Sequence, residues 1–411
     1  MKICIISNLY PPFVRGGAEL IAAMEAEGLK KAWQHVSVIS TRPANIHVHG
    51  QMVWRTGLWT STRDEVGDIE VIRFNPVNLY YYLDDFKFPS FIRLFWHLFD
   101  IFNVFSYWKI KNILLKEKPD VVITHNLMGI GFLIPLLIRK LKIRHIHTLH
   151  DIQLSSPSGL IVLGQEKAWQ HRFFRAIGYV KIMRSLMGSP EIVISPSKFL
   201  LDFYSRDKFF PKSKKFVMPN PIKGLASVPK QASDNLELIY LGQIHRAKGV
   251  LELIKNFKQI AEPNIRLHIV GAGPELFRAQ HLASEDKRII FYGWLPHHEL
   301  GKILPQMDIV VVPSLCYENS PTVIYESLSL GLPVLAADIG GTAELIKEGI
   351  NGWVFPAGDF GILKDKIKGL YKEKGKVGLM ADNCRRSVAA YNLDNYIKHI
   401  LKIIGEAKDV E

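Results

Sequence analysis

Two glutamates eight positions apart carry the most specific chemistry in the sequence. Glu318 lies in a loop, and Glu326 lies inside a helix predicted over Pro321–Leu330, with Ser320 and Pro321 typical of an N-cap and a first helical position. Carboxylates accept strong hydrogen bonds from hydroxyl groups. The first N–H groups of a helix have no acceptor within the helix and attract anions. This element therefore offers two carboxylates for sugar hydroxyls and a helix end for phosphate, at the N–H groups of Thr322 and Val323.

Two cations lie in a glycine-containing turn that follows a predicted strand over Leu236–Leu241. The turn begins with Gly242 and Gln243 and continues to Arg246 and Lys248. Guanidinium and ammonium groups bind phosphate oxygens, so these two side chains could neutralise a diphosphate. Solvated charges on a surface loop would look the same, and both interpretations stay open.

A Gly-Gly pair separates the first predicted strand from the first predicted helix. Gly16 and Gly17 have no Cβ, which lets a ligand approach the backbone closely. N–H groups at a helix N-terminus lie in a positive potential that suits phosphate. The surrounding residues fit neither a Walker A loop nor the GxGxxG dinucleotide pattern. An ordinary strand-to-helix turn is the alternative.

A His-Asp pair follows another predicted strand, over Arg144–Leu149. In doubly wound folds ligands bind beyond the carboxyl ends of the strands, so His150 is well placed for function. His145 and His147 share a strand face, which raises the question of a metal site. The sequence suggests no fourth ligand nearby, so we predict no metal here, and a structural role for the histidines is the alternative.

Short runs rich in Val and Ile alternate along the chain with longer helical patterns. Within these runs, apolar and polar residues alternate too little for strands with one face in solvent. The runs therefore resemble buried parallel strands. The first series is Lys2–Ser7, Val36–Ser40, Glu70–Phe74, Asp120–Thr124, Arg144–Leu149 and Glu191–Ser195, and the second is Leu236–Leu241, Arg266–Val270, Ile289–Phe291, Ile309–Val312 and Pro333–Ala336. Helical patterns between them include Ala18–Gln34, Gly249–Ala261, Pro321–Leu330 and Phe360–Lys374. Two successive βαβ series predict an α/β protein with two doubly wound, Rossmann-like domains.

The domain boundaries follow from the same pattern. We expect an N-terminal domain over residues 1–222 and a C-terminal domain over 223–390. The segment Lys212–Lys230, with three prolines, is interpreted as the linker. Residues 391–411 have helical spacing and an apolar stripe, so we expect a last helix that docks back on the N-terminal domain.

Composition places the chain among globular proteins. It has 411 residues, 48% apolar and 22% charged, and no run of 18 uncharged apolar residues that would predict a membrane-spanning helix. The short apolar run after Lys2 is interpreted as a strand and not as a signal peptide. Three widely spaced cysteines form neither a disulfide framework nor a metal pattern, which fits a reducing cytoplasm.

Positive charge is concentrated in the first half. Residues 1–222 contain 29 basic and 17 acidic side chains, whereas residues 223–411 contain 23 and 22. This surplus indicates an anionic partner, although charge that serves only solubility is the alternative. The segment Tyr80–Trp108 is rich in aromatic residues, and apolar side chains recur at helical spacing from Phe91 to Phe105. Core packing is the ordinary explanation of such a stripe; contact with a membrane surface or an acceptor is the other.

At these residues the chain resembles the retaining glycosyltransferases of the GT-B fold, family 4 in particular. The element from Glu318 to Glu326 is that family's signature. Further typical motifs extend over nearly the whole chain, among them Gly16-Gly17, Lys118-Pro119-Asp120, His147–Asp151, Pro219-Asn220-Pro221, Gly331-Leu332-Pro333 and Gly340-Gly341-Thr342.

The resemblance implies two Rossmann-like domains that face each other across a cleft and a transfer of a sugar from a nucleotide sugar to an acceptor hydroxyl with retention. It implies that Glu326 holds the ribose, and that Glu318 and the amides of Asn319–Val323 hold the sugar and phosphate. Lys248, aided by Gly16-Gly17, would neutralise the diphosphate, and His150 would contact the donor sugar. No metal or other cofactor is expected.

The chain departs from the family pattern at one position that bears on catalysis. The family often has Arg where this chain has Gln243, so we expect Lys248, with Arg246, to carry more of the charge compensation. The acceptor is expected to be a glycan or lipid-linked glycan in surface polysaccharide, lipopolysaccharide or glycolipid assembly. The protein would then be cytoplasmic, in peripheral contact with an anionic membrane at its inner face.

Three other functions compete with sugar transfer. A sugar-nucleotide epimerase could share the fold, although the paired glutamates argue against it. An inactive nucleotide-sugar-binding scaffold would need a missing catalytic group, and only the charge absent at Gln243 suggests one. Nucleic-acid binding is not expected, since the basic half has no known recognition module.

Overall fold

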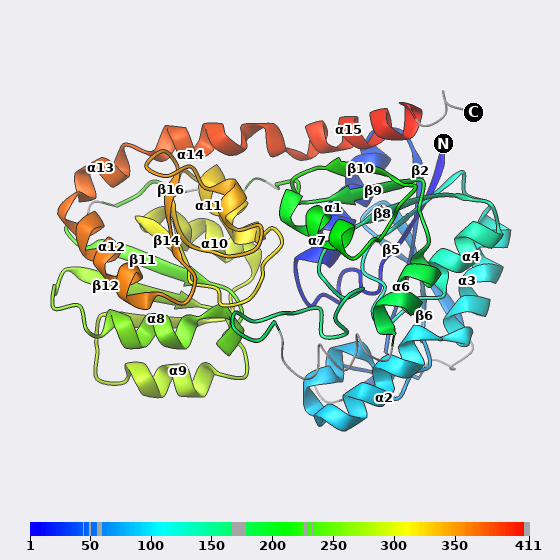
Figure 1. The fold of residues 1–411 in the computed structure, drawn as a ribbon, viewed down its shortest axis with the longest axis horizontal. Helices are drawn as coiled ribbons and strands as arrows, with labels where there is room; N and C mark the ends of the chain where they lie inside the picture. Colours follow the sequence, from blue (N-terminus) through cyan, green and yellow to red (C-terminus); the bar gives the residue numbers. More distant parts are fainter. Residues whose placement is uncertain are drawn as a thin grey trace. The chain divides into compact units, whose positions relative to one another are not determined.

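The structure is a computed structural model that describes residues 1–43, 45–48, 51–55, 60–166, 178–222, 224, 228–231 and 233–406. Contacts divide the chain into two compact units. The first consists of Met1–Gly159, Trp169–Pro221 and Leu393–Glu411, and the second of Leu160–Ala168 and Ile222–Asn392. Each unit is an α/β domain built on a parallel sheet, as the sequence predicts (Figure 1).

The first unit is built on an eight-stranded sheet in the order β10-β9-β8-β7-β1-β2-β6-β5. All neighbours are parallel except β5, which pairs antiparallel with β6. The strands β1, β7 and β9 are buried along their whole length or nearly so, which explains their unbroken Val and Ile runs. The strands are β1 (Lys2–Ile6), β2 (His35–Thr41), β5 (Ser61–Val66), β6 (Ile69–Phe74), β7 (Val121–Thr124), β8 (Arg144–Thr148), β9 (Ile192–Ser195) and β10 (Lys214–Val217), with a separate hairpin of β3 (Asn45–Val48) and β4 (Gln51–Arg55).

Helices of the first unit include one from the far end of the chain. They are α1 (Gly17–Lys31), the 3-10 helix η1 (Tyr82–Lys87), α2 (Ser90–Ile101), α3 (Val104–Glu117), α4 (Ile134–Lys140), α6 (Tyr179–Met187), α7 (Lys198–Arg206) and α15 (Leu393–Glu406). The last of these, red in Figure 1, buries Tyr396, Ile397 and Ile400 in the same core as Ile3 of β1 and Ala22 of α1. The apolar stripe at the end of the sequence therefore completes the core of the first unit.

The aromatic segment forms η1, α2 and the start of α3. Trp96 on the inner face of α2 is buried, donates from Nε1 to the Tyr80 carbonyl at 2.8 Å and stacks on Tyr80 and Tyr82. The outer face carries an exposed set of side chains, which we call the aromatic face: Phe91, Phe95, Leu98, Phe99, Phe102, Phe105 and Trp108. Phe91 is 65% exposed and Phe99 60%.

Core packing, the ordinary expectation for this stripe, is therefore wrong for the aromatic face. The physical reason is that no single continuous helix carries this stripe, which is divided between α2 and α3. Helix α2 ends at Ile101, and the Asn103 side chain caps α3 by accepting the Ser106 N–H at 2.9 Å. Only the side of α2 that carries Trp96, Asp100 and Ile101 reaches the interior.

The second unit contains a six-stranded, all-parallel sheet in the order β13-β12-β11-β14-β15-β16. Its strands are β11 (Leu236–Leu241), β12 (Ile265–Val270), β13 (Ile289–Gly293), β14 (Ile309–Val312), β15 (Val334–Asp338) and β16 (Gly352–Pro356). The chain order reverses between β11 and β14, which makes this the switch point where ligands bind in doubly wound folds.

Helices pack against both faces of this sheet and create two cores. One core includes residues of α8 (Val250–Phe257), α9 (Leu276–Ala283) and α12 (Phe360–Lys372), and the other includes residues of α10 (His297–Ile303), α11 (Thr322–Ser329) and α14 (Ala381–Val388). Shorter elements connect them: η2 (Arg246–Lys248), η3 (Leu304–Gln306), η4 (Ala343–Leu345), α13 (Lys374–Gly378) and η5 (Ala389–Tyr391).

Two boundaries differ from the sequence expectation. The segment interpreted as a linker, Lys212–Lys230, contains strand β10, because Lys214–Val217 pairs with β9 at the edge of the first sheet. An edge strand needs only one partner and tolerates polar residues. Because β10 begins with Lys214 and Lys215, it lacks the apolar run that would predict a strand. The segment Leu160–Ala168 groups with the second unit, although the sequence expectation assigned it to the first domain. The alternation of strands and helices does not predict this change.

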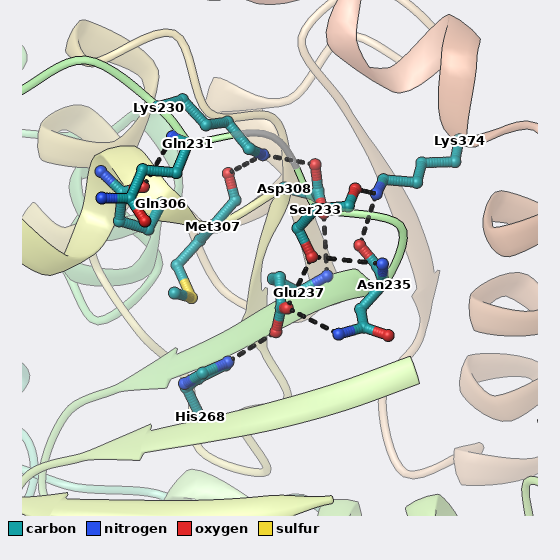
Figure 2. A network of polar contacts seen from close by, with 10 residues as sticks. All are labelled: Lys230, Gln231, Ser233, Asn235, Glu237, His268, Gln306, Met307, Asp308 and Lys374. Carbon is teal, nitrogen blue, oxygen red and sulfur yellow. Dashed lines mark hydrogen bonds and ion pairs between the residues drawn. The ribbon is translucent and has the colours of Figure 1, made fainter. Parts of the chain in front are cut away.

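A polar network fixes the amino-terminal edge of the second sheet (Figure 2). Near the start of β11, Glu237 binds Nε2 of His268 at 2.8 Å, and its backbone N–H donates to Asp308 at 2.8 Å. Asp308 also pairs with Lys230 at 2.5 Å. Burial would raise the pKa of Glu237, but the hydrogen bonds from His268 and neighbouring groups hold it below its usual value. These polar groups lie at the opposite edge from the carboxyl ends of the strands, so we assign them a structural role.

No helix in the described part of the chain is both long and apolar enough to cross a membrane.

The contact between α1 and α15 gives a stability prediction. A Cβ added to Gly28 of α1 would lie 2.5 Å from Cγ1 of Ile397 on α15. Gly28→Ala should therefore lower the free energy of unfolding by about 1–3 kcal/mol through overpacking, although alanine favours a helix by about 1 kcal/mol. Thermal and urea unfolding measure this. Gly405→Ala, on α15 with open space around it, is the control and should be neutral or slightly stabilising; a stable Gly28→Ala protein would contradict the packing.

Candidate functional site

The second unit brings Lys248 and Glu318 into direct contact at the switch point. Lys248 closes the turn after β11, and Glu318 lies in the loop after β14, the neighbouring strand. Nζ of Lys248 lies 2.5 Å from Oε1 of Glu318. The side chains are 30% and 15% exposed, so the pair is only partly solvated. The sequence predicts both residues but not their contact, because they are 70 positions apart.

Mutual attraction controls the ionisation of this pair. Burial would raise the pKa of the Glu318 carboxyl, but the nearby ammonium of Lys248 and hydrogen bonds from Lys248, Ser314 and Cys316 lower it below its usual value. Burial would likewise lower the pKa of Lys248, and the Glu318 carboxylate raises it instead. Both groups are therefore charged at neutral pH, and the pair keeps a positive and a negative group beside the end of the sheet.

The loop that carries Glu318 is held at several points. Ser314 Oγ donates to Glu318 Oε1 at 2.7 Å, and the Leu315 N–H donates to the Ala247 carbonyl at 2.9 Å, which ties the two loops together. The Gly341 N–H donates to the Glu318 carbonyl at 2.7 Å. Gly340 has φ +64°, and a Cβ there would lie 2.1 Å from that carbonyl oxygen. A glycine at position 340 is therefore required for the close approach of this loop.

A segment from the first half of the chain also supports this loop. The Leu163 N–H donates to the Leu315 carbonyl at 2.7 Å, and the Tyr317 N–H donates to the Ile161 carbonyl at 3.0 Å. The Tyr317 hydroxyl donates to Glu166 at 2.9 Å. The two segments thus meet at one isolated antiparallel β-bridge, between Val162 and Cys316. No sequence signal near residues 160–166 indicates this contact.

Helix α11 begins one residue later than the sequence predicts. Pro321 is the N-cap, with no side-chain capping bond, and Thr322 is the first helical residue. The expectation of Ser320 as N-cap is wrong, because its hydroxyl bonds the Tyr325 hydroxyl at 2.5 Å instead. The amides of Thr322 and Val323 still belong to the first turn, where helix geometry provides no acceptor. The helix end therefore keeps its attraction for an anion.

Glu326 lies in the second turn of α11 and is 19% exposed. Its Oε1 lies 3.6 Å from Nε2 of His297, the first residue of α10. No local pattern in the sequence indicates His297, because its contact with Glu326 joins two different helices. A carboxylate and an imidazole side by side can bind vicinal hydroxyls such as those of a ribose.

The two remaining predicted residues of the Lys248 turn are exposed. Tyr240 donates from its hydroxyl to the Gln243 carbonyl at 2.6 Å, which fixes the backbone of the turn. Arg246 Nε pairs with Glu275 at 2.6 Å. The guanidinium expected to assist Lys248 is therefore paired with a carboxylate, as Lys248 itself is with Glu318, and it is the more exposed of the two cations, at 69% against 30%.

The predicted Gly-Gly pair lies in the first unit, at the start of α1. The Gly16 N–H donates to Oε2 of Glu19 at 2.8 Å, within the first turn of the helix. The Gly16 N–H therefore already has an acceptor within the protein, the glutamate at the third helical position that caps it. Gly17 is the first helical residue and retains the position expected for it.

His150 also lies in the first unit, directly beyond β8. Its Nε2 lies 2.9 Å from Nδ1 of His125, which follows β7, and the two rings stack at 5.1 Å. Burial lowers the pKa of His150 to about 4, so the ring is neutral at physiological pH. The sequence analysis did not identify His125.

The neighbouring histidines are structural, as the alternative held. His145 Nε2 and His147 Nδ1 each lie 2.8 Å from the Thr124 hydroxyl on the adjacent strand. The described ranges contain no cluster of three or more His, Cys, Asp or Glu side chains arranged to hold a metal ion.

The Lys248–Glu318 pair gives a second stability prediction. In Lys248→Met, Glu318 loses its cation in a poorly solvated site, and we expect a loss of about 2 kcal/mol at pH 7. The pKa of Glu318 is lowered in the folded protein, so the stabilisation from the pair is complete above the unfolded value of about 4.3 and is lost only as pH falls below it. In Lys248→Met the burial that raises the pKa of Glu318 acts without the cation, so the carboxyl protonates as pH falls and the deficit should shrink towards pH 4. Thermal unfolding from pH 4 to 8 measures it.

The double variant Lys248→Met/Glu318→Gln supplies the control. With no buried charge left, it should regain much of the lost stability at pH 7. If it is as unstable as the single variant, the loss does not arise from an uncompensated carboxylate.

Models of two glycosyltransferase families match the chain. Glycosyltransferase Family 4 matches residues 15–223, and Glycosyl transferases group 1 matches residues 226–387. Among curated relatives, an uncharacterised 42.6 kDa protein in the cps region of Klebsiella pneumoniae is 26% identical over 84% of this chain and 87% of its own. The Escherichia coli UDP-Gal:alpha-D-GlcNAc-diphosphoundecaprenol alpha-1,3-galactosyltransferase is 26% identical over 83% of this chain and 88% of its own.

Solved structures confirm the predicted fold class. Anabaena HepE in complex with UDP-glucose superposes with a TM-score of 0.68 at 15% identity, over 99% of this chain and 100% of its own. The chain contains two α/β domains with mainly parallel sheets, and it superposes on HepE over nearly its full length. Both observations fit a GT-B fold. With one family model spanning half of the chain and a second covering most of the rest, the protein belongs to the family 4 glycosyltransferases of the GT-B fold.

Proposed function

We propose that the protein moves a sugar from a nucleoside diphosphate sugar to an acceptor hydroxyl with retention of configuration at the anomeric carbon. The contact between Lys248 and Glu318 beside the first turn of α11 carries this proposal. One small region thereby combines a cation and helix amides for a diphosphate with carboxylates for sugar hydroxyls. No single one of these groups would specify a nucleotide sugar, but their combination does.

The chemistry that these groups support is departure of the nucleoside diphosphate. The bond from the anomeric carbon to the β-phosphate oxygen breaks, and its electron pair leaves with the diphosphate. The acceptor oxygen bonds to the same face of that carbon, and its proton passes to the departing phosphate oxygen. Lys248 and the amides of Thr322 and Val323 stabilise the charge that develops on the leaving group. Because these groups supply that stabilisation, we propose that transfer is metal-independent.

The remaining roles follow from chemistry and from the family. Glu326 binds the ribose, and His297 beside it helps to orient the carboxylate. Glu318 accepts hydrogen bonds from the sugar hydroxyls, and Asn319 and Ser320 line the same loop. His150 of the first unit contacts the donor sugar near the reacting carbon.

We propose an acceptor in surface polysaccharide or lipopolysaccharide assembly. One relative is named for a UDP-galactose donor and a diphosphoundecaprenol-linked acceptor, another comes from a cps region, and a structural neighbour binds UDP-glucose. UDP-sugars are therefore the first donors to screen. A lipid-linked acceptor would place the enzyme at the cytoplasmic face of the membrane.

The aromatic face supports peripheral contact with an anionic membrane. It combines exposed rings with cations, since Lys111 Nζ lies 4.6 Å from the Trp108 ring centre. A cavity of about 390 Å³ lies beside it, lined in part by Phe105, Trp108 and Lys109. Exposed aromatic rings flanked by lysines are typical of helices that lie in the headgroup region of anionic bilayers.

Product analysis with radiolabelled nucleotide sugars tests the proposed reaction. We expect label in a glycan or lipid product, whereas an isomerised donor would indicate the alternative of an epimerase. Lys248→Ala should lower kcat by more than tenfold because the leaving group loses its cation. Lys255→Ala, on the surface of α8, is the control and should leave kcat unchanged. A loss below about threefold for Lys248→Ala would contradict the phosphate role.

Cosedimentation with vesicles tests the membrane contact. Binding should rise with the fraction of anionic lipid, and Phe95→Ser/Phe99→Ser should reduce it at least fivefold through loss of buried apolar area. Phe277→Ser is the matched control, because that ring is 84% exposed on α9 of the second unit. Binding that ignores both lipid charge and the paired substitution would refute the proposal.

A further inference from the structure

A chain of buried polar groups runs through the first unit and ends at His150. The Tyr396 hydroxyl, on α15, donates to Oε2 of Glu25 at 3.1 Å. The same oxygen lies 3.8 Å from Nε2 of His125. Nδ1 of His125 then lies 2.9 Å from Nε2 of His150. The chain thus crosses from the C-terminal helix through α1 to the carboxyl ends of β7 and β8.

Stability alone does not account for this chain. Glu25 and His125 are fully buried, next to an aliphatic core that includes Ala22, Ala26 and Ile400. Within the described residues, Oε1 of Glu25 and Nε2 of His125 have no hydrogen-bond partner. Each buried polar atom without a partner costs about 1–3 kcal/mol, so apolar side chains would stabilise the core better.

The protonation states of the two imidazoles determine how this chain of polar groups acts on His150. Burial lowers the pKa values of both His125 and His150, so both rings are neutral at physiological pH. A neutral imidazole has one donor nitrogen and one acceptor nitrogen. Burial also raises the pKa of Glu25 to about 7, with the Tyr396 hydrogen bond opposing it, so at pH 8 the carboxylate prevails.

The order of the groups then determines which nitrogens carry protons. A carboxylate facing Nε2 of His125 favours a proton on that nitrogen. Nδ1 of His125 is then the acceptor, and Nε2 of His150 must donate to it. In that tautomer, Nδ1 of His150 is an acceptor.

We propose that Glu25 and His125 are positioning residues that fix the tautomer and ring orientation of His150. This inference rests on the proposed function only for its catalytic consequence, since the tautomer itself is a property of the free protein. An imidazole that contacts a reacting sugar must present the correct nitrogen, and a partner on the other side of the ring selects it.

The tautomer can be measured directly by ¹⁵N NMR of the full-length protein labelled at histidine, at pH 8. His125→Asn and His150→Asn assign the two signals. We expect His150 to be protonated at Nε2, and we expect Glu25→Gln to shift it towards the Nδ1-protonated form. Glu27→Gln, which removes the same charge from the same helix, should leave the tautomer unchanged. A His150 protonated at Nδ1 in the unaltered protein, or one unaffected by Glu25→Gln, would overturn the proposal.

Kinetics test the catalytic consequence. His125→Leu should lower kcat at least tenfold with the donor KM changed less than threefold, because binding survives and only the presentation of His150 is lost. His125→Asn, whose amide oxygen can accept in place of Nδ1, should stay within about threefold of the unaltered enzyme. If both variants lose the same activity, the loss arises from structural damage and not from a change in how His150 is positioned.

His150→Ala separates this inference from the proposed function. If transfer survives that substitution, the role proposed for His150 is wrong. The NMR experiment would still test independently whether Glu25 and His125 fix the tautomer of His150.

Discussion

The organisation of the second unit depends on one ion pair between adjacent strand ends. Lys248 follows β11 and Glu318 follows β14, and these strands are neighbours only because the order of the sheet reverses between them. The Lys248 side chain is 30% exposed and that of Glu318 15%, so each charge is stabilised by the other and the pair links the two loops. The glycine at Gly340, the hydrogen bond from Leu315 to Ala247 and the added segment around Leu163 all serve to hold the two loops at this separation.

The first unit uses a different device at the corresponding edge of its sheet. There two imidazoles lie beyond the strands, His125 fully buried and His150 half-buried, and burial keeps both rings neutral at physiological pH. His125 and His150 stack beyond β7 and β8, and Thr124 below them satisfies His145 and His147. The two units thus differ at this edge: the second carries a lysine paired with a glutamate, and the first carries two neutral imidazoles in contact.

Much of this could be predicted from the sequence because the informative signals are local. The Val and Ile runs predicted the core strands, and the spacing of Glu318 and Glu326 indicated the family. What could not be predicted depends on contacts between distant positions. The pairing of Lys248 with Glu318, of Glu326 with His297 and of Glu25 with His125 has no trace in local spacing. Periodicity also cannot tell whether an apolar stripe is covered, which is why Phe91 and Phe99 were expected in a core and are exposed. Ser320 failed as a cap because a nearby tyrosine competes for its hydroxyl.

The return of α15 to the first unit has a consequence for biosynthesis. The core of that unit contains Ile3 from the start of the chain and Ile400 from its end. A ribosome must therefore synthesise the whole second unit before the first can close over its apolar interior. Until then the groove that receives α15 is open to solvent, and a nascent chain stalled or truncated before Leu393 would expose it to chaperones and proteases.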